Sequence, residues 1–226
     1  MKKLILLVSL FVVACGTSSD KNSILDKSSC KLPCWNNIVA GETTEDELLA
    51  TLENLPEIDP KSIQNTNQAW SIFDNQIFFS FRQGWTLSQR PKLRGYAYTT
   101  NSILSELIIC GDTKTSIGAI AKQAGEPENI ISGDNVTGDR AVILVNSKKG
   151  LAYWYSTDPK LDEMHYEIGP ETKVGCLALF DSDLYQEMLE AKEFSNGYYN
   201  AEETLRVWYP WDGYGNLDEK YPPRQP

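Results

Sequence analysis

Two stretches of the chain repeat the same order of helix signals, and this repeat restricts the fold more than any other feature. The first is GETTEDELLATLENLP, residues 41–56, and the second is GDTKTSIGAIAKQAGEP, residues 111–127. Each opens with glycine, an acid and threonine, continues with apolar residues at helical spacing, and ends at a proline. Gly41 and Gly111 lie 70 positions apart, and Pro56 and Pro127 lie 71 apart. The second stretch therefore has one residue more than the first between its glycine and its proline. A period of this length indicates tandem supersecondary units.

Both stretches predict short amphipathic helices. In the first, Thr44 and Glu47 have the spacing of a capping box, and the leucines at 48, 49, 52 and 55 give one apolar face. In the second, the start signal is residues 111–113, Ile117 and Ile120 share a helical face, and Gly125 is expected to end the helix as a left-handed cap before the proline.

Strand signals follow each predicted helix. After the first come AWSIF (69–73), IFFSFR (77–82) and GYAYTTNSILSELIIC (95–110), the last with a hairpin turn at 99–102. After the second come NIIS (129–132), RAVILVNS (140–147), LAYWYS (151–156) and KVGCLALF (173–180), with a turn at NSKKG (146–150). The sequence therefore predicts an α+β protein with two tandem units of helix and antiparallel strands, residues 30–112 and 113–181. A C-terminal helix near 184–194 and an aromatic tail complete residues 182–226. The alternative is two unrelated α+β segments that share a common helix-start signal.

The first residues have the layout of a secretory signal. Two lysines precede ten apolar or small residues from Leu4 to Val13, a run too short to span a bilayer. The following VVAC, residues 12–15, resembles the bacterial lipobox, and this resemblance implies removal of residues 1–14 and acylation of Cys15. Residues 15–29 are polar and serine-rich, so they are expected to be a lipid anchor and flexible tether. The alternative is an ordinary secreted protein cleaved nearby.

Four further cysteines, Cys30, Cys34, Cys110 and Cys176, are an even number in a chain with an export signal, so disulfides are expected. Three pairings are possible. We favour Cys30–Cys34 and Cys110–Cys176, because Cys110 ends the last strand of the first unit and Cys176 lies in the last strand of the second. A zinc or redox role is the alternative, but the spacing is C-x₃-C.

The net charge of the chain is −10, from 31 acidic and 21 basic residues. Removal of the leader also removes two lysines and leaves the protein more acidic. Binding to nucleic acid, or flat docking on anionic lipid, needs concentrated positive charge, so neither partner is expected. Acyl chains on Cys15 would then hold the protein on the extracytoplasmic face of the cell membrane or outer membrane.

The second helical stretch, GDTKTSIGAIAKQAGEP, resembles the helical part of the small outer-membrane-assembly lipoproteins and of the tandem-repeat β-lactamase inhibitory proteins. The resemblance implies helices packed on an antiparallel sheet and a protein that binds other proteins rather than catalysing a reaction. LPCWNNIVAGETT, residues 32–44, also resembles uncharacterised bacterial lipoproteins.

No residue pattern predicts catalysis, a metal site or a cofactor. His165 is the sole histidine and no Gly-x-Ser-x-Gly elbow or phosphate-binding glycine loop is present. Acidic neighbours such as Asp181 with Asp183, or Asp162 with Glu163, are interpreted as helix starts or loops. Residues 212–219, DGYGNLDE, alternate oxygen ligands at Asp212, Asn216 and Asp218 but lack the glycine and closing glutamate positions of a calcium loop.

Aromatic residues crowd the C-terminal tail and are the candidate binding residues: Trp208, Tyr209, Trp211 and Tyr214. Aromatic side chains are enriched where proteins bind other proteins. The first hypothesis is therefore a non-catalytic lipoprotein that binds another protein through a sheet face or this tail. The alternative is a carbohydrate- or small-ligand-binding lipoprotein in which Trp208 and Trp211 stack on the ligand. If the tail instead completes the core, Trp208, Tyr209 and Trp211 belong to the folded body.

Overall fold

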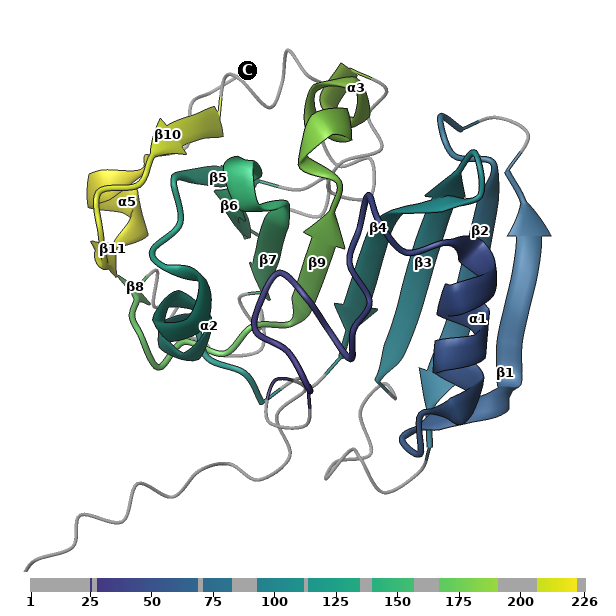
Figure 1. The fold of residues 1–226 in the computed structure, drawn as a ribbon. Coiled ribbons are helices and arrows are strands. Elements are labelled where there is room, and N and C mark those ends of the chain that lie inside the picture. Colours follow the sequence, from purple (N-terminus) through teal and green to yellow (C-terminus); the bar gives the residue numbers. More distant parts are fainter. Residues whose placement is uncertain are drawn as a thin grey trace, which may run out of the picture.

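The computed structural model describes residues 25, 28–68, 71–82, 93–111, 114–134, 140–156, 167–190 and 207–222. The predicted signal peptide, Cys15 and the tether up to residue 24 lie outside these residues. The described chain is a mixed α+β protein built mainly from strands, as predicted (Figure 1). None of its described helices is long and apolar enough to cross a membrane.

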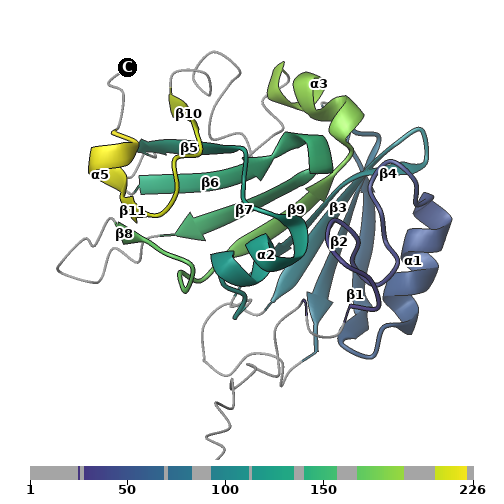
Figure 2. The same ribbon diagram turned by 60° about the vertical axis from the view of Figure 1, so that its left-hand side comes forward.

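The strands form one large sheet of nine members, in the order β1-β2-β3-β4-β9-β7-β6-β5-β10, and all neighbours are antiparallel. A separate pair joins β8 to β11. The bounds are β1 Ile58–Asn67, β2 Asn75–Phe81, β3 Arg94–Thr100, β4 Ile103–Cys110, β5 Asn129–Asp134, β6 Arg140–Asn146, β7 Leu151–Ser156, β8 Glu167–Ile168, β9 Cys176–Phe180, β10 Trp208–Pro210 and β11 Gly215–Asn216. The sheet twists strongly between its β1–β4 half and its β5–β9 half (Figure 2).

In both halves a helix precedes a set of antiparallel strands. Helix α1 (Glu45–Asn54) precedes β1–β4, and α2 (Ile117–Ala124) precedes β5–β7 and β9. Both helices lie on the same face of the sheet, in front of it in Figure 1. We call this the inner face and the opposite one the outer face. The halves meet where β4 pairs with β9.

Helix α1 begins with the predicted capping box. Glu47 N donates to the Thr44 hydroxyl, and the Glu47 carboxylate accepts from Thr44 N at 3.0 Å. The carboxylate of Glu45 accepts from Thr99 Oγ1 at 2.6 Å and from the side-chain amides of Asn75 and Asn65 at 2.9 and 2.8 Å. These bonds tie the start of α1 to β3, β2 and β1.

Helix α2 follows the opening signal at residues 111–113. Its cap is Ser116, whose hydroxyl accepts from Ala119 N, and the helix starts at Ile117. A serine is as good a cap as a threonine, and starting there buries Ile117 and Ile120 against the sheet. Gly125 ends the helix with φ +82°, and Lys149 Nζ donates to the carbonyl of Ala124.

In the first half, one strand prediction was wrong and one strand was not predicted. Residues 71–73 of the expected strand 69–73 form bends instead, and 69–70 lie outside the described residues. The strand β1 was not predicted, because its sequence is polar and contains Pro60. Its position explains this composition: β1 is the outermost strand, its pairing with β2 is irregular between Asp59 and Gln64, and most of its side chains contact water.

The predicted hairpin turns are confirmed. Asn101 and Ser102 join β3 to β4 with φ of +52° and +61°, the left-handed conformation that two-residue hairpins require. Between β6 and β7, Gly150 has φ +60°, and a Cβ there would lie 1.9 Å from the carbonyl oxygen of Phe180, so only glycine fits. The C-terminal helix begins as expected, with a 3₁₀ turn at Ser182–Leu184 followed by α3, Tyr185–Glu190.

Each face of the sheet has its own core. The inner core packs under α1 and α2 and includes Trp35, Leu48, Leu52, Ile77, Phe79, Leu107, Ile117, Ile120, Leu144 and Leu177. The outer core lies mainly on the second half, where α3 contributes Met188 and Leu189, and it includes Phe73, Ile108, Ile131, Ile143, Val145, Trp154 and Phe180. Trp35 is one of the largest fully buried side chains of the inner core.

The structure contains both favoured disulfides. Cys30–Cys34 closes a local loop at the entry to the domain, with a sequence separation of 4. Cys110–Cys176 has a separation of 66 and links residues that lie directly opposite each other on β4 and β9. The second bridge therefore fastens the two halves at their junction.

Candidate functional site

The predicted binding residues of the tail are part of the sheet edge. Trp208 and Tyr209 lie in β10, which pairs with β5 so that Trp208 is opposite Ile131. Trp208 packs on the outer core, with its ring 6.2 Å from that of Tyr185, whereas Tyr209 points to the inner core. Successive residues of a strand point to opposite faces, which accounts for this division.

Trp211 and Tyr214 belong to a second aromatic group beside β10. Trp211 stacks on Tyr221 at a centroid distance of 5.9 Å and an interplanar angle of 9°, and it meets Tyr214 edge-on at 5.3 Å. The buried hydroxyl of Tyr221 accepts from Asp212 N and donates to the carbonyl of Gly213. Burial raises the pKa of the Tyr221 phenol, so the group stays neutral and keeps donating.

The two tryptophans of the tail do not share a surface. Trp208 packs on the outer core and Trp211 on the inner core, and both are partly buried. A sugar ring stacked between them, or across both, would need the two indoles on one side of the sheet. The structure therefore does not bring this pair together as a ligand platform.

A different aromatic group lies on the outer face of the first half. Phe78 of β2 and Tyr96 of β3 pair across the strands with ring centroids 5.4 Å apart, and both are partly exposed. Tyr98, also partly exposed, packs against Phe73 at 4.8 Å and accepts from Gln76 Nε2 at 2.9 Å. We call Phe78, Arg94, Tyr96 and Tyr98 the aromatic patch.

Arg94 lies at one end of the patch, at the start of β3. Its guanidinium carbon lies 5.7 Å from the centroid of the Tyr96 ring, within the range of a cation–π contact. The side chain is exposed, and within the described part of the chain no carboxylate forms an ion pair with it. The patch thus combines accessible aromatic surface with one available positive charge.

The aromatic patch was not among the binding residues predicted from the sequence. A signal was present, because aromatics alternate with other residues in IFFSFR and RGYAYTT. In β2 the buried set is Ile77, Phe79 and Phe81, so Phe78 must face the other way. Alternation alone does not say which face is covered, and the covering depends on where α1 packs.

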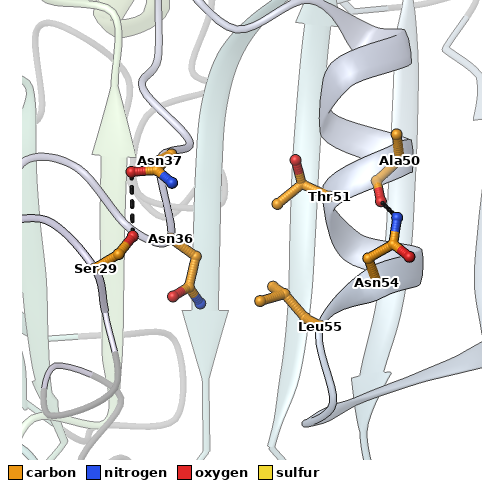
Figure 3. A pocket seen from close by; sticks show the side chains of 7 residues that line it. All are labelled: Ser29, Asn36, Asn37, Ala50, Thr51, Asn54 and Leu55. Atoms are coloured by element: carbon orange, nitrogen blue, oxygen red, sulfur yellow. Dashed lines mark hydrogen bonds between the residues drawn. The ribbon is translucent and has the colours of Figure 1, made fainter.

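A polar hollow of about 420 Å³ lies between the N-terminal segment and α1 (Figure 3). Its walls are Ser29, Asn36 and Asn37 on one side and Ala50, Thr51, Asn54 and Leu55 on the other. The polar groups largely bind one another. Ser29 donates to Asn37, Asn54 donates to the carbonyl of Ala50, and Asn36 donates to the buried Glu57 carboxylate at 3.3 Å. These bonds engage several of the lining groups within the protein.

Among the polar candidates that the structure describes, Asp181 and Asn216 serve as helix caps. Asp181 Oδ1 accepts from Asp183 N at 3.0 Å at the 3₁₀ turn, and Asn216 Oδ1 accepts from Asp218 N at the start of helix α5, Leu217–Lys220. Asp212 pairs with Lys220 at 3.4 Å. Within the residues that the structure describes, no three His, Cys, Asp or Glu side chains come together as a metal site. His165, Asp162 and Glu163 lie outside those residues.

Comparison with known proteins assigns no family to the chain: no family model, no curated protein and no solved structure matches it. Its function must therefore be inferred from its own surfaces. Of those described above, the aromatic patch is the one that leaves large apolar groups accessible beside an available charge.

Proposed function

We propose that the protein is a non-catalytic lipoprotein of the cell envelope that binds another protein through the aromatic patch. The observation that carries this proposal is the partial exposure of Phe78 and Tyr96, paired side by side on the outer face of β2 and β3. Tyrosine and arginine are enriched among residues that dominate binding energy at protein interfaces. A rigid sheet also presents them at little entropic cost, because the strands hold their positions.

The lipid anchor is part of the same proposal. The leader and VVAC support acylation at Cys15, with a tether reaching to residue 29 and the domain held on the extracytoplasmic side. An anchored protein of this acidity is expected to meet a protein partner rather than nucleic acid or the lipid surface.

We further propose that the two halves are copies of one unit. In each half, the residue just before the helix cap accepts a backbone hydrogen bond from near the start of the last strand of that half. Leu104 N donates to Thr43 O at 2.8 Å in the first half, and Val174 N donates to Thr115 O at 2.9 Å in the second. These bonds support a correspondence of about 70 residues between the halves.

The junction gives independent support for this correspondence. Ile108 of β4 lies directly opposite Ala178 of β9, 70 positions further along the chain. Two identical strands that pair antiparallel about a twofold axis have one residue opposite its own equivalent. The register of β4 and β9 is the one that two fused copies would have, with the axis between Ile108 and Ala178.

Site-directed photo-crosslinking in native membranes tests the binding proposal. A photoreactive residue at position 78 or 96 should give a discrete crosslinked product. The same residue at Glu53 on α1 or Asp218 on α5, both exposed, should not. The double substitution Phe78→Ser/Tyr96→Ser should abolish a product formed from Gln76, which lies beside the patch and donates to Tyr98.

Products from Glu53 or Asp218 alone, or no product from the patch, would reject the patch as the binding surface. The variant Cys15→Ala, followed in the same membranes, tests the anchor separately. It should move the protein into the soluble fraction, and continued tight association would place the attachment elsewhere.

A further inference from the structure

Arg94, at one end of the aromatic patch, indicates the chemistry of the partner. This inference rests on the proposed binding function. Arg94 is exposed, and its guanidinium lies over the Tyr96 ring at 5.7 Å. An arginine stacked on an aromatic ring keeps the edge of its planar fork, with five N–H donors, directed away from the ring. That edge is the part that binds a carboxylate in a bidentate geometry.

Among the residues that the structure describes, the neighbours of Arg94 in the sheet offer this edge no charged partner. Across β2 it faces Ser80, and across β4 it faces Cys110, both uncharged. Among the described residues, the ion pairs are formed by Lys148 and Lys220, at a distance in sequence from the patch. In a chain with a net charge of −10, acidic groups are abundant, yet none of those described lies within ion-pair distance of Arg94.

The apolar part of the patch indicates which group a ligand must carry beside its carboxylate. Phe78 and Tyr96 form a paired aromatic surface immediately beside Arg94, with Tyr98 further along the same strand. A ligand that covers both the rings and the guanidinium needs an apolar side chain and an acid a few ångströms apart. A protein segment with an aspartate or glutamate next to an aromatic or aliphatic residue meets this requirement.

We propose that the partner presents an acidic peptide segment to the patch, in which a carboxylate binds Arg94 while an adjacent apolar side chain packs on Phe78 and Tyr96. Coverage by the partner would exclude water from the ion pair and strengthen it. Arg94 is then the residue that sets specificity, and the two aromatic rings supply most of the apolar contact. A polyanion such as nucleic acid does not fit, because its binding draws on many cations and the described patch has one.

Arrayed synthetic peptides provide the probe. Each peptide carries a central phenylalanine or leucine flanked by Asp or Glu, by Asn or Gln, or by Lys or Arg, and the array is exposed to the mature chain. Acidic peptides should be retained about tenfold more tightly than their amide counterparts, the ratio expected of one well-formed charge pair at an interface. The preference should weaken as salt is raised, since a pair at the patch border is partly screened.

Substitutions distinguish the contribution of the Arg94 charge to peptide binding from that of the aromatic rings. Arg94→Gln should remove the acidic preference while leaving weak binding to apolar peptides, and Arg94→Lys should restore part of it. Lys148→Gln, at a cation whose side chain is 86% exposed, is the matched control and should change nothing. Equal or stronger retention of amide or basic peptides, an acidic preference that survives Arg94→Gln, or no retention of any peptide overturns the inference. The proposed binding function would still be judged independently, by the crosslinks from positions 78 and 96.

Discussion

At the scale of single residues, Glu45 joins helix α1 to three strands through one carboxylate. The hydrogen bond from Thr99, with those from Asn75 and Asn65, holds the pKa of this carboxyl below its usual value of 4.5, although burial acts in the opposite direction. A carboxyl whose pKa is lowered on folding stabilises the folded state above its ordinary pKa. That contribution is lost as the pH falls toward the lowered value.

Glu45→Gln should therefore destabilise the protein most near neutral pH. The amide replaces one acceptor oxygen with a donor that faces the donors of Thr99 and the asparagines. Urea unfolding of both proteins at about pH 7 and about pH 3.5 should show a stability difference that shrinks at the lower pH. Glu53→Gln, exposed on the same helix, is the control and should have little effect. A difference that stays constant with pH would show that the carboxylate charge is not involved.

Some requirements of single residues come only from packing across strands. Gly95 in β3 lies opposite Phe79 in β2, and a Cβ at Gly95 would lie 2.0 Å from the tip of the Phe79 ring. Nothing in the local sequence marks Gly95 as a position where only glycine fits, because the constraint comes from a side chain 16 positions earlier. The capping box at Thr44 is predictable for the opposite reason, since both of its partners lie within one helical turn.

At the scale of elements, β10 closes one edge of the sheet by pairing with β5, and Trp208 is its main contact with the outer core. Loss of a fully buried tryptophan typically costs about 3–5 kcal/mol, and Trp208 is only partly buried, so Trp208→Ala should cost about 2 kcal/mol. Chemical denaturation measures this loss. Pro210→Ala, exposed at the end of the same strand, should change stability little. Unchanged stability of Trp208→Ala would mean that β10 does not contribute to the folded body.

Elements with strong local signals were predictable, and elements defined by their place in the sheet were not. The hairpin turn before β4 follows from Asn101 and Ser102, and the sixth and seventh strands follow from long apolar runs. Strand β1 has no such run, because an outermost strand with exposed side chains needs little apolar surface. The cap of α2 at Ser116 was not predicted, since threonine and serine both occur nearby and each can cap a helix.

At the scale of the whole molecule, the two disulfides should differ in their effect on stability. In the chain-entropy treatment, a bridge with a separation of 66 contributes about 4 kcal/mol, and one with a separation of 4 contributes about 2 kcal/mol. Replacing Cys110 and Cys176 together by alanine should therefore lower the unfolding free energy by about 2 kcal/mol more than replacing Cys30 and Cys34. Equal losses, measured by urea unfolding, would mean that the bridge at the junction does not restrict the unfolded chain as expected.

The aromatic patch depends on the arrangement of the whole sheet, so it could not be predicted from the sequence. The patch exists because β2 and β3 pair in a register that places Phe78 beside Tyr96, and because α1 packs on the opposite face. Counting aromatic residues pointed instead to the tail, where they are densest, but Trp208 and Trp211 there pack on separate cores. The cysteine pairing was easier to predict, since Cys110 and Cys176 each lie in the last strand predicted for its half of the chain.

The arrangement of the sheet also bears on how quickly the chain can fold. In the first half, β1, β2 and β3 each pair with the next strand in sequence, and in the second half β5 pairs with β6 and β6 pairs with β7. Such contacts close short loops and form early, whereas contacts between distant segments lose more chain entropy and form late. The pairing of β4 with β9 joins residues 66 to 74 positions apart. We therefore expect two hairpin stacks to form first, and the meeting of β4 with β9 to limit the rate at which the sheet becomes continuous.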